Sequence, residues 1–358
     1  MELKKIFSRD SLFSRKNNII GIDFNNNAFK LVEIAHQVGG QKLLFCGESR
    51  ISKGAMDTGY IKDQEKMFFV LEKIVTEAGD RLVGNQAVVA IPEGKVFIRV
   101  VTIPKIDENK IGEAIRWEAE ANIPMSLDSV YYDWQLLEKK EKEIRVVVVA
   151  SPKNLIDNYI DFFSKVGIEI VAFEAESIAT GRSVIPIEKE GCSMILDIGR
   201  EGSSIAVYEN GVPVFTTSSS ISGNSFTDSV MRKFGIKEEK AEKYKAKVGL
   251  GSTKAEKNEA LKIYQPVLAS LTNDVNKTID FFENSLSGVK YNKIDEIIVC
   301  GGGANLKGLV EYLSAQVQKR TLRSNPWINF KGEKLCKTMN QERAQSYATA
   351  IGLALRNN

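Results

Sequence analysis

Two segments that lie about half a chain apart follow the same pattern, and this repeat constrains the fold more than any other feature. The segment "IIGIDFNNNAFKLVEI" (residues 19–34) has an apolar strand, Asp23, a polar turn and a second apolar strand. The segment "SMILDIGREGSSIAVYENGVPVF" (residues 193–215) has the same order of features around Asp197. A supersecondary unit that recurs within one chain indicates a duplicated domain. We therefore expect two such hairpin turns, facing each other across a cleft.

The two aspartates are candidates for a metal and phosphate site. Backbone N–H groups in a tight turn can bind phosphate oxygens, and Mg²⁺ retains water molecules that one or two carboxylates hold. One aspartate from each turn, Asp23 and Asp197, could therefore orient the waters of a Mg²⁺ ion on a β- and a γ-phosphate. The alternative is an ordinary hairpin, because aspartate is common before a turn.

A third segment adds a glycine-rich corner. In "EIIVCGGGANLKGLVEYL" (residues 296–313) a strand ends in three glycines and an alanine, and a helix is expected to follow at once. Glycines allow a backbone to lie flat against a planar ligand and to start a helix tightly. The segment lacks the Lys-Ser/Thr of a Walker loop, and its glycine spacing differs from a dinucleotide fingerprint. Alone it could be a simple turn, but its order and spacing with the two hairpins are more specific.

Strand-like and helical patterns alternate along the rest of the chain. The expected strands cover 19–22, 29–35, 87–91, 96–101, 144–150, 194–198, 205–208, 212–217 and 296–300. The expected helices cover 68–78, 155–166, 267–282 and 306–317, where apolar residues recur at helical spacing. The highly charged segment 237–260 indicates a helical, solvent-rich subdomain. Hairpins mixed with βα units predict an α/β protein with parallel and antiparallel strands.

Composition excludes several functional classes. The chain has 358 residues, of which 43% are hydrophobic and 27% charged, which is typical of a globular protein with two domains. A net charge of +3 gives no electrostatic signature for nucleic acid. The four cysteines are far apart and there is one histidine, which argues against a zinc site. The first 17 residues have no continuous apolar core, so we expect a cytoplasmic protein.

These motifs together resemble the actin/Hsp70/hexokinase superfamily and, within it, the type IV pilus assembly PilM family, which is related to the division protein FtsA. "GIDFNNNAFKLVEI" and "LDIGREGSSIAVYENG" resemble the two phosphate loops, and "CGGGANLKGLVEYL" resembles the adenosine motif. "IRVVTIPKIDENKIGEAIRWEAEANIPMSLDSVYYDWQLL" resembles the inserted subdomain of the PilM family. The resemblance covers nearly the whole chain. It implies duplicated actin-like, ribonuclease H-like domains that flank a nucleotide cleft.

The resemblance also implies ligand contacts, with ATP or ADP and Mg²⁺ as cofactors. Asp23 and Asp197 would hold the metal through water. Phosphate would be bound by the backbones of Asn25, Asn26 and Asn27, with Lys30 nearby, and by the segment that contains Gly199, Gly202, Ser203 and Ser204. The adenosine motif would consist of Gly301, Gly302, Gly303 and Ala304.

Two further motifs complete the implied nucleotide site. Gly223 lies in "SISGNSFT", which resembles a Gly-Gly-x-x-x-Thr motif whose first glycine is Ser222 here. Glu242 and Lys245 match a helix that reaches the ribose and base, and their spacing places both on one helical face. For Lys245, a solvated charge on a charged helix is an equally good interpretation.

The first phosphate loop departs from the family at Asn25, where glycine is usual. Asparagine tolerates a positive φ angle better than most residues, so we expect the turn to form. Nucleotide binding should weaken, or the Asn25 amide should donate a substitute hydrogen bond. Arg200-Glu201 is a second departure, in a place where small residues are usual. We therefore expect nucleotide binding with slow or absent hydrolysis. Glu174 and Glu176 are candidates to orient the attacking water, although helix-surface charge explains them equally well.

The implied domain organisation is an N-terminal tail (1–17) followed by four subdomains. Subdomain 1A covers 18–92, completed by about 151–190 and 335–358, and the inserted subdomain 1C covers 93–150. Subdomain 2A covers 191–236 and 265–334, and subdomain 2B covers 237–264.

The family resemblance also implies a location and partners. The protein would act at the inner face of the cytoplasmic membrane, where it binds the N-terminal cytoplasmic peptide of PilN in a groove between 1A and 1C. It would communicate with the pilus motor ATPases and platform proteins, and self-association is a further implication. The aromatic residues Trp117, Tyr131, Tyr132 and Trp134 are candidates for the groove, but we expect most of them in the core.

Two alternative functions remain open. An FtsA-like filament former would append a linker and an amphipathic C-terminal helix, which this sequence does not show. A small-molecule kinase of the same superfamily would need a substrate pocket with a catalytic aspartate in the first domain, and no motif indicates one.

Overall fold

The computed structural model describes residues 18–38, 40–107, 110–251, 253–284, 289–334 and 339–356. The predicted N-terminal tail, residues 1–17, lies outside these ranges. The chain folds into two compact units. Unit 1 comprises residues 1–183, 327–339 and 349–358, and unit 2 comprises residues 184–326 and 340–348. The finer subdomain boundaries expected from the sequence remain predictions.

Unit 1 is built on a six-stranded sheet with the order β10-β6-β1-β2-β3-β16. Strands β1, β2 and β3 form antiparallel hairpins, whereas β6 and β10 run parallel to β1. The strands are β1 (Asn18–Phe24), β2 (Ala28–Gln37), β3 (Gly40–Arg50), β6 (Gln86–Ile91), β10 (Glu169–Ala175) and β16 (Gly332–Lys334). A short two-stranded sheet pairs β4 (Met56–Asp57) with β5 (Tyr60–Ile61).

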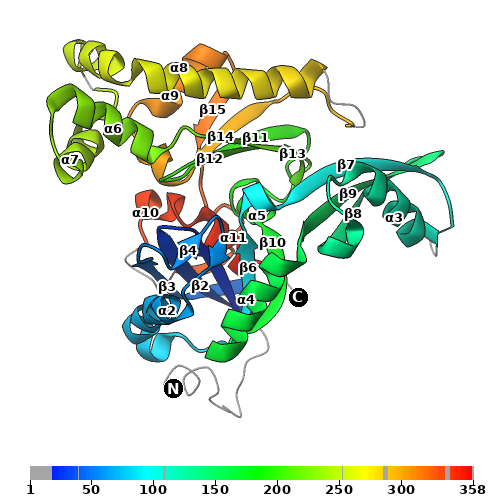
Figure 1. Cartoon of the computed structure of the whole chain (residues 1–358). Coiled ribbons are helices and arrows are strands. Elements are labelled where there is room, and N and C mark those ends of the chain that lie inside the picture. The colour runs from blue at the N-terminus through cyan, green and yellow to red at the C-terminus, as the bar shows by residue number, and fades with distance from the viewer. Residues whose placement is uncertain are drawn as a thin grey trace. The chain divides into compact units, whose positions relative to one another are not determined.

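Helices cover both faces of this sheet, and β1 alternates between them. On one face, β1 contributes Ile20, Ile22 and Phe24 to a core that also contains residues of α2 (Gln64–Ala78) and α4 (Lys153–Val166). Figure 1 shows these two helices beside the sheet. Ile19 faces a second cluster with α5 (Glu176–Val184) and α11 (Ala348–Ala354).

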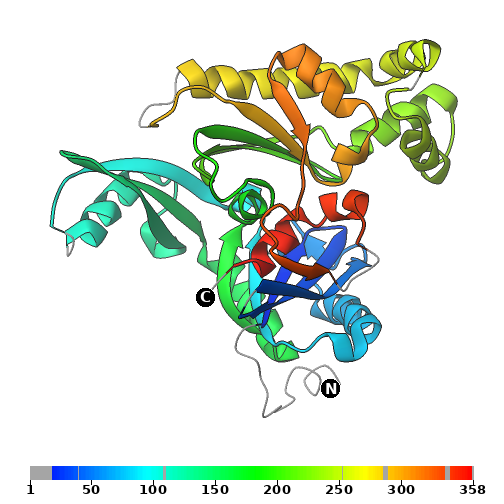
Figure 2. The same ribbon diagram turned by 180° about the vertical axis from the view of Figure 1, so that it is seen from behind.

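Glycine allows a close contact between β1 and α11, because a Cβ at Gly21 would lie 2.1 Å from the carbonyl oxygen of Ala350. Figure 2 shows α11 beside the strands of unit 1 from behind. The C-terminal helix is thus part of the core built around the first strand.

Helix ends in unit 1 follow the local sequence. The Asp63 side chain caps α2 by accepting a hydrogen bond from the backbone N–H of Lys66, at 3.1 Å. Helix α4 ends at Gly167, whose φ of 81° is the left-handed conformation that favours glycine. Both helices were predicted from apolar periodicity, and both predictions are confirmed.

A second, three-stranded sheet is inserted between β6 and α4. Its order is β7-β9-β8 and its strands are β7 (Phe97–Pro104), β8 (Val130–Lys139) and β9 (Glu143–Pro152). All neighbours are antiparallel. Helix α3 (Ile111–Asn122) packs Ile111, Ile115 and Ala119 against one face, where Val146 and Val148 of β9 are buried. The strand expected over residues 144–150 is therefore confirmed, and it is the central strand of this sheet.

Unit 2 repeats the topology that strands β10, β6, β1, β2 and β3 have in unit 1. Its sheet has the order β13-β12-β11-β14-β15, with antiparallel hairpins β11–β12–β13 and parallel β14 and β15. The strands are β11 (Cys192–Ile198), β12 (Ser203–Glu209), β13 (Val212–Ser219), β14 (Glu296–Cys300) and β15 (Arg320–Arg323). Thus β11 corresponds to β1, β12 to β2 and β14 to β6. The repeat read from the sequence is a duplication of a whole sheet.

The helices of unit 2 are α6 (Gly223–Phe234), α7 (Glu238–Val248), α8 (Lys254–Asn284), α9 (Leu309–Val317) and α10 (Gln341–Gln345). The charged segment predicted as a helical subdomain forms α7 and the first turns of α8. Short 3₁₀ turns complete the chain: Gly79–Arg81, Glu93–Lys95, Leu127–Ser129 and Gly302–Asn305. The last of these turns contains the glycine-rich motif.

Candidate functional site

The hairpin of unit 1 places Asp23 at the end of β1, directly opposite Lys30 on β2. The Asp23 carboxylate is 7% exposed, and its Oδ2 lies 3.7 Å from the Lys30 ammonium. Lys30 is in turn opposite Glu48 on β3, so three charged residues form a row across the sheet. Burial raises the pKa of Asp23; Lys30 opposes this shift and Glu48 adds to it. Asp23 is thus a buried carboxylate whose surroundings favour its protonated form.

The turn after Asp23 is closed by the side chain of Asn25. The Asn25 Oδ1 accepts hydrogen bonds from the backbone N–H groups of Asn27, at 2.9 Å, and Ala28, at 3.2 Å. The Asn25 N–H donates to the Ala28 carbonyl at 3.1 Å. None of the three asparagines has a positive φ, since the described non-glycine residues with positive φ are Thr58, Asn210 and Gln318. The prediction that Asn25 would exploit a positive φ was therefore wrong: its side chain, not its backbone freedom, shapes the turn.

The hairpin of unit 2 has the same frame with a glycine in place of Asn25. Asp197 is opposite Ser204 and the Gly199 N–H donates to the Gly202 carbonyl at 2.9 Å. A Cβ at Gly199 would lie 2.8 Å from that carbonyl oxygen, so this position requires glycine. Arg200, one of the departures from the family pattern, forms an ion pair of 2.6 Å with Glu238 at the start of α7.

The segment around Gly223 is fastened to this second hairpin. The Gly223 N–H donates to the Gly199 carbonyl at 2.8 Å, and the Asn224 N–H donates to the Arg200 carbonyl at 2.9 Å. The Ser203 hydroxyl donates to the Ile221 carbonyl at 2.5 Å. Ser222, which replaces the first glycine of the family motif, caps α6 in a reciprocal pair with Ser225. The start of α6 and the hairpin therefore form one structural element.

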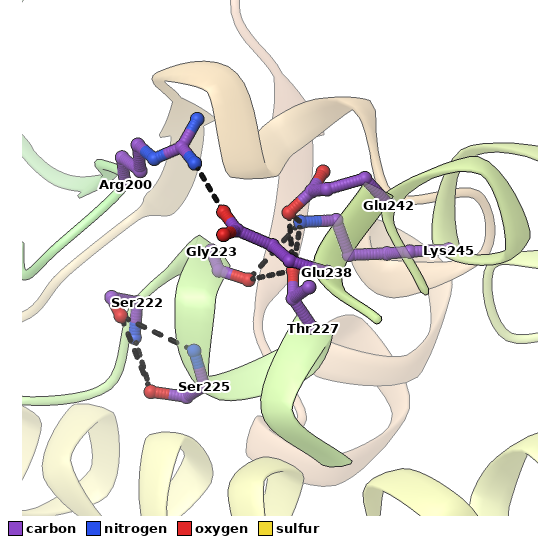
Figure 3. A network of polar contacts seen from close by, with 8 residues as sticks. All are labelled: Arg200, Ser222, Gly223, Ser225, Thr227, Glu238, Glu242 and Lys245. Atoms are coloured by element: carbon purple, nitrogen blue, oxygen red, sulfur yellow. Dashed lines mark hydrogen bonds and ion pairs between the residues drawn. The ribbon is translucent and has the colours of Figure 1, made fainter. Parts of the chain in front are cut away.

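Glu242 and Lys245 of α7 meet this element, as Figure 3 shows. The Lys245 ammonium donates to the Gly223 carbonyl at 3.1 Å, to the Thr227 hydroxyl at 2.7 Å and to Glu242 at 2.8 Å. The Thr227 hydroxyl also lies within hydrogen-bonding distance of the Glu242 carboxylate. Burial favours the neutral form of Glu242, but hydrogen bonds from Lys245 and Thr227, together with the charges of Lys245 and Arg200, lower its pKa.

Lys245 is therefore part of a network and not a solvated surface charge. Thr227 was not singled out from the sequence, although it occupies the last position of the Gly-Gly-x-x-x-Thr pattern. The Arg200–Glu238 pair was also missed, because the partners lie 38 residues apart and share no local pattern.

The glycine-rich corner lies against Asp197. A Cβ on Gly301, whose φ is 77°, would lie 2.2 Å from the Asp197 Oδ1, and a Cβ on Gly303 would lie 2.2 Å from the Ile198 side chain. Burial raises the pKa of the neighbouring Cys300 thiol, and the charge of Asp197 and a hydrogen bond to it add to the shift. The expectation of a helix starting directly at the glycines was wrong. Gly302–Asn305 is a 3₁₀ turn and α9 begins at Leu309, after a second left-handed glycine at Gly308.

The two candidate water-orienting residues are held by other groups. Glu174 is 6% exposed and accepts hydrogen bonds from Arg182, at 2.6 and 2.8 Å, and from Arg356, at 2.5 Å. Glu176 accepts a hydrogen bond from the Glu93 N–H at 3.0 Å. Glu93 reciprocates by accepting from the Ser177 N–H at the start of α5. These contacts favour structural roles, and the catalytic role of both residues remains a prediction.

The four aromatic residues expected mostly in the core are on the surface. Trp117 is 67% exposed, Tyr131 48%, and Tyr132 and Trp134 36% each. The last three belong to β8, an edge strand of the inserted sheet. The prediction of a core role was wrong, because Trp117 lies on the exposed side of α3 and β8 is exposed on both faces at Tyr131, Tyr132 and Trp134. At its start, the Tyr131 hydroxyl donates to Asp157 of α4 at 3.2 Å, which connects the inserted sheet to the main body of unit 1.

The described residues also set limits on metal binding and membrane insertion. They contain no group of three or more His, Cys, Asp or Glu side chains able to hold a metal ion directly. No helix in the described ranges combines the length and the apolar character needed to cross a bilayer.

Comparison with known families decides the classification. The family model for the type IV pilus assembly protein PilM matches residues 21–358. The chain belongs to this family. A solved PilM–PilN type IV pilus biogenesis complex is similar in fold, with a TM-score of 0.75 and 23% identity over 94% of this chain and 97% of that chain.

Other similarities bear on the fold. MreB5 of Spiroplasma citri bound to ADP has a TM-score of 0.55 and 16% identity over 94% of this chain and 95% of that one. The cell division protein FtsA of Staphylococcus epidermidis is 23% identical over 200 residues, which cover 52% of this chain. The match spans 43% of the length of that FtsA. The fold is therefore the actin-like fold, as the family resemblance implied.

Proposed function

We propose that this protein is an actin-like, nucleotide-binding scaffold of the type IV pilus assembly machinery. The observation that carries the proposal is the match of the PilM family model across residues 21–358. The geometry of the two hairpins supports it, because each places an aspartate beside a tight turn. In this role the protein acts at the inner face of the cytoplasmic membrane and connects a membrane component to the motor ATPases.

The proposed ligand is ATP or ADP with Mg²⁺. Solved MreB5 structures with this fold contain ADP or AMPPNP. Asp23 and Asp197 would each hold a water molecule of Mg²⁺, since this ion keeps much of its hydration shell. Single carboxylates suit such outer-sphere binding, for which a direct cage of several protein ligands is unnecessary. When bound, Mg²⁺ would neutralise phosphate charge. In unit 2 the Gly301 backbone lies against Asp197, which fits a site where a ligand approaches the main chain closely.

We propose slow or absent hydrolysis. A general base must be free to contact water, but the Glu174 carboxylate is engaged by two arginines and Glu176 by a backbone N–H. Calorimetry with Mg-ADP and Mg-ATP, beside a steady-state ATPase assay, tests both parts on wild type, Asp23→Ala and Asp197→Ala. We expect binding to weaken about tenfold or more in each variant, as is typical for lost charged contacts. Robust steady turnover by the wild type would contradict slow hydrolysis, and unchanged binding by Asp23→Ala would contradict its metal role.

The proposed partner is the N-terminal cytoplasmic peptide of PilN, bound between the main body of unit 1 and the inserted sheet. Capture of a short extended peptide would recruit this protein to a membrane protein. The start of β8 supports this location. Tyr131 contacts both Asp157 and Lys153 of α4, and Tyr132 and Trp134 follow it with exposed rings. Exposed aromatic side chains of this kind dominate the binding energy of many interfaces.

A peptide-binding measurement tests this role. A synthetic peptide of the PilN amino terminus should bind the wild type, and Tyr132→Ala and Trp134→Ala should each weaken binding about tenfold. Ile187→Ala is the matched control, since Ile187 is 73% exposed in unit 2 and should have no effect. Failure of the wild type to bind the peptide would remove the proposed partner.

A filament-forming role is the second candidate function. Its support is the sequence similarity to FtsA over 200 residues. Sedimentation with lipid vesicles and Mg-ATP distinguishes the two, because a filament former would pellet cooperatively above a critical concentration even without the PilN peptide.

A further inference from the structure

The duplicated hairpins provide an internal reference for the first phosphate loop. In both units the turn begins two residues after the aspartate and is closed by an N–H to carbonyl bond between its first and fourth residues. These bonds are Asn25 to Ala28 at 3.1 Å and Gly199 to Gly202 at 2.9 Å. The two turns therefore have the same length, the same register and the same closing bond, and only the turn of unit 1 carries a side chain at its first position.

That single side chain changes which donors the turn offers. In unit 1 the Asn25 Oδ1 accepts from the N–H groups of Asn27 and Ala28, at 2.9 and 3.2 Å. In unit 2 the corresponding position is Gly199, which has no side chain and so cannot engage the N–H groups of Glu201 or Gly202. A carbonyl oxygen on two adjacent backbone donors has the geometry with which a phosphate oxygen binds in such a turn. The Asn25 Oδ1 thus occupies the position in which a phosphate oxygen would accept these two hydrogen bonds.

We propose that Asn25 is a specificity-determining residue of the first loop, whose side-chain oxygen competes with a nucleotide phosphate for the Asn27 and Ala28 N–H groups. The inference rests on the proposed nucleotide site and adds a competitor within it. To bind there, a phosphate must displace the Asn25 side chain, which is exposed and can rotate away. As a consequence, the N–H groups of Asn27 and Ala28 have hydrogen-bond acceptors without a ligand, and the loop binds phosphate weakly.

The neighbouring cation strengthens this inference. Lys30 lies opposite Asp23 and Glu48 in the sheet, and its ammonium is 3.7 Å from the Asp23 carboxylate. Its charge is therefore partly balanced by protein carboxylates. Both kinds of group that would attract phosphate in this hairpin, the backbone donors and the lysine, already have protein partners.

Calorimetry on wild type and four variants tests the competition, with ADP, ATP and adenosine as probes. Asn25→Gly and Asn25→Ala remove the competing oxygen, so the Kd for ADP and ATP should fall about tenfold, as expected for two released hydrogen bonds of moderate strength. Asn25→Asp keeps the oxygen and adds negative charge, so its Kd should rise at least about threefold. Glu72→Gln changes an exposed residue of α2 in the same unit and leaves the loop intact, so its Kd should match the wild type. Adenosine carries no phosphate, so its Kd should not change in any variant. Melting temperatures verify that each variant is folded.

The possible outcomes separate the inference from the function on which it rests. If the wild type binds ADP and neither Asn25→Gly nor Asn25→Ala binds it more tightly, the competitor role is overturned and the nucleotide site stands. Among these outcomes, weaker binding by both variants would assign the Asn25 amide as a phosphate donor. If ADP binds neither the wild type nor these variants, the nucleotide site is overturned and the inference with it.

Discussion

Three of the buried carboxylates in unit 1, those of Asp23, Glu33 and Glu174, have different kinds of partners. Glu174 meets the guanidinium groups of Arg182 and Arg356. Glu33 accepts hydrogen bonds from the N–H groups of Val83 and Gly84 and from the Asn18 side chain, at 2.7–3.1 Å. Asp23 has the Lys30 ammonium at the longer distance of 3.7 Å, and the nearby Glu48 raises its pKa further. Asp23, the one of these acids that lies in the proposed ligand loop, thus has a raised pKa, and acids with shifted pKa values commonly lie at functional sites.

Replacing Glu174 with glutamine should destabilise the protein. The change removes a buried charge but leaves two arginines without their anion, and both are partly exposed, at 28% and 37% of the side chain. We expect a loss of about 2–3 kcal/mol in the free energy of unfolding, below the range for fully buried pairs because water can reach the guanidinium groups. Urea denaturation measures the loss. Glu169→Gln, an exposed position in the same strand, should cost less than about 0.5 kcal/mol. Equal losses of stability in the two variants would contradict a stabilising role for the ion pairs of Glu174 with Arg182 and Arg356.

Replacing Asp23 with asparagine should change how stability depends on pH. Burial, opposed by Lys30 and reinforced by Glu48, raises the pKa of Asp23 above its ordinary value of 3.8. The folded wild type therefore binds this proton more tightly than the unfolded chain does. Its stability should fall as pH rises from 3.8 through the raised pKa. Asp23→Asn has no titratable group at this position and so lacks this pH dependence. Its free energy of unfolding, relative to that of the wild type, should therefore increase as pH rises from 3.8 through the raised pKa of Asp23.

A control of opposite sign makes this measurement specific. Hydrogen bonds from Lys165 and Gln64 lower the pKa of Asp161 on α4. Asp161 therefore contributes stability that is present above the unfolded pKa and lost as pH falls through the lowered one. Relative to wild type, Asp161→Asn should lose stability as pH rises from the lowered pKa of Asp161 to its ordinary value of 3.8. Urea midpoints between pH 3 and pH 8 follow both variants, and a pH-independent difference for Asp23→Asn would disprove the raised pKa.

At the scale of elements, local patterns predicted most strands and helices but not their polar contacts. The hairpins β1–β2 and β11–β12 follow from apolar runs on either side of a polar turn. Strand β3 (Gly40–Arg50) was not predicted, because its ends are polar and its apolar run "LLFC" is short. The Asn25 bonds were not predicted either, since an Asx-type turn and a glycine turn have the same strand pattern. The Glu174–Arg356 contact spans 182 residues, so only the folded chain shows it.

The corner between β14 and the turn Gly302–Asn305 should depend on Gly301. Its φ of 77° and ψ of 175° lie in a region that only glycine readily adopts, and a Cβ would approach the Asp197 carboxylate. Gly301→Ala should therefore lower the free energy of unfolding by about 2–3 kcal/mol. Gly302→Ala is the matched control, because a Cβ there has no neighbour within 4 Å in the described structure. Thermal or urea unfolding that fails to separate the two alanine variants would refute the close approach.

At the scale of the whole molecule, neither unit is a continuous piece of sequence. The chain passes between the units at 183/184, 326/327, 339/340 and 348/349. Helix α11, at the C-terminal end of the described chain, fills the face of the unit 1 sheet to which the first strand, β1, contributes Ile19 and Gly21. A duplicated topology therefore does not mean two independent halves. Unit 1 needs residues that are synthesised after all of unit 2.

Removing residues 349–358 should consequently destabilise unit 1 more than unit 2. The truncation deletes Leu353, which is buried against Ile19 and Val88, and Arg356, which pairs with Glu174. All three tryptophans, Trp117, Trp134 and Trp327, belong to unit 1, so tryptophan fluorescence reports on this unit while circular dichroism reports on both. We expect the fluorescence midpoint in urea to fall sharply, since losing a buried Leu and a partly buried ion pair costs several kcal/mol. Circular dichroism should retain a later transition from unit 2. Deleting only residues 357–358 should leave both curves at wild-type midpoints, and coincident shifts of both probes after the longer deletion would show instead that the two units unfold together.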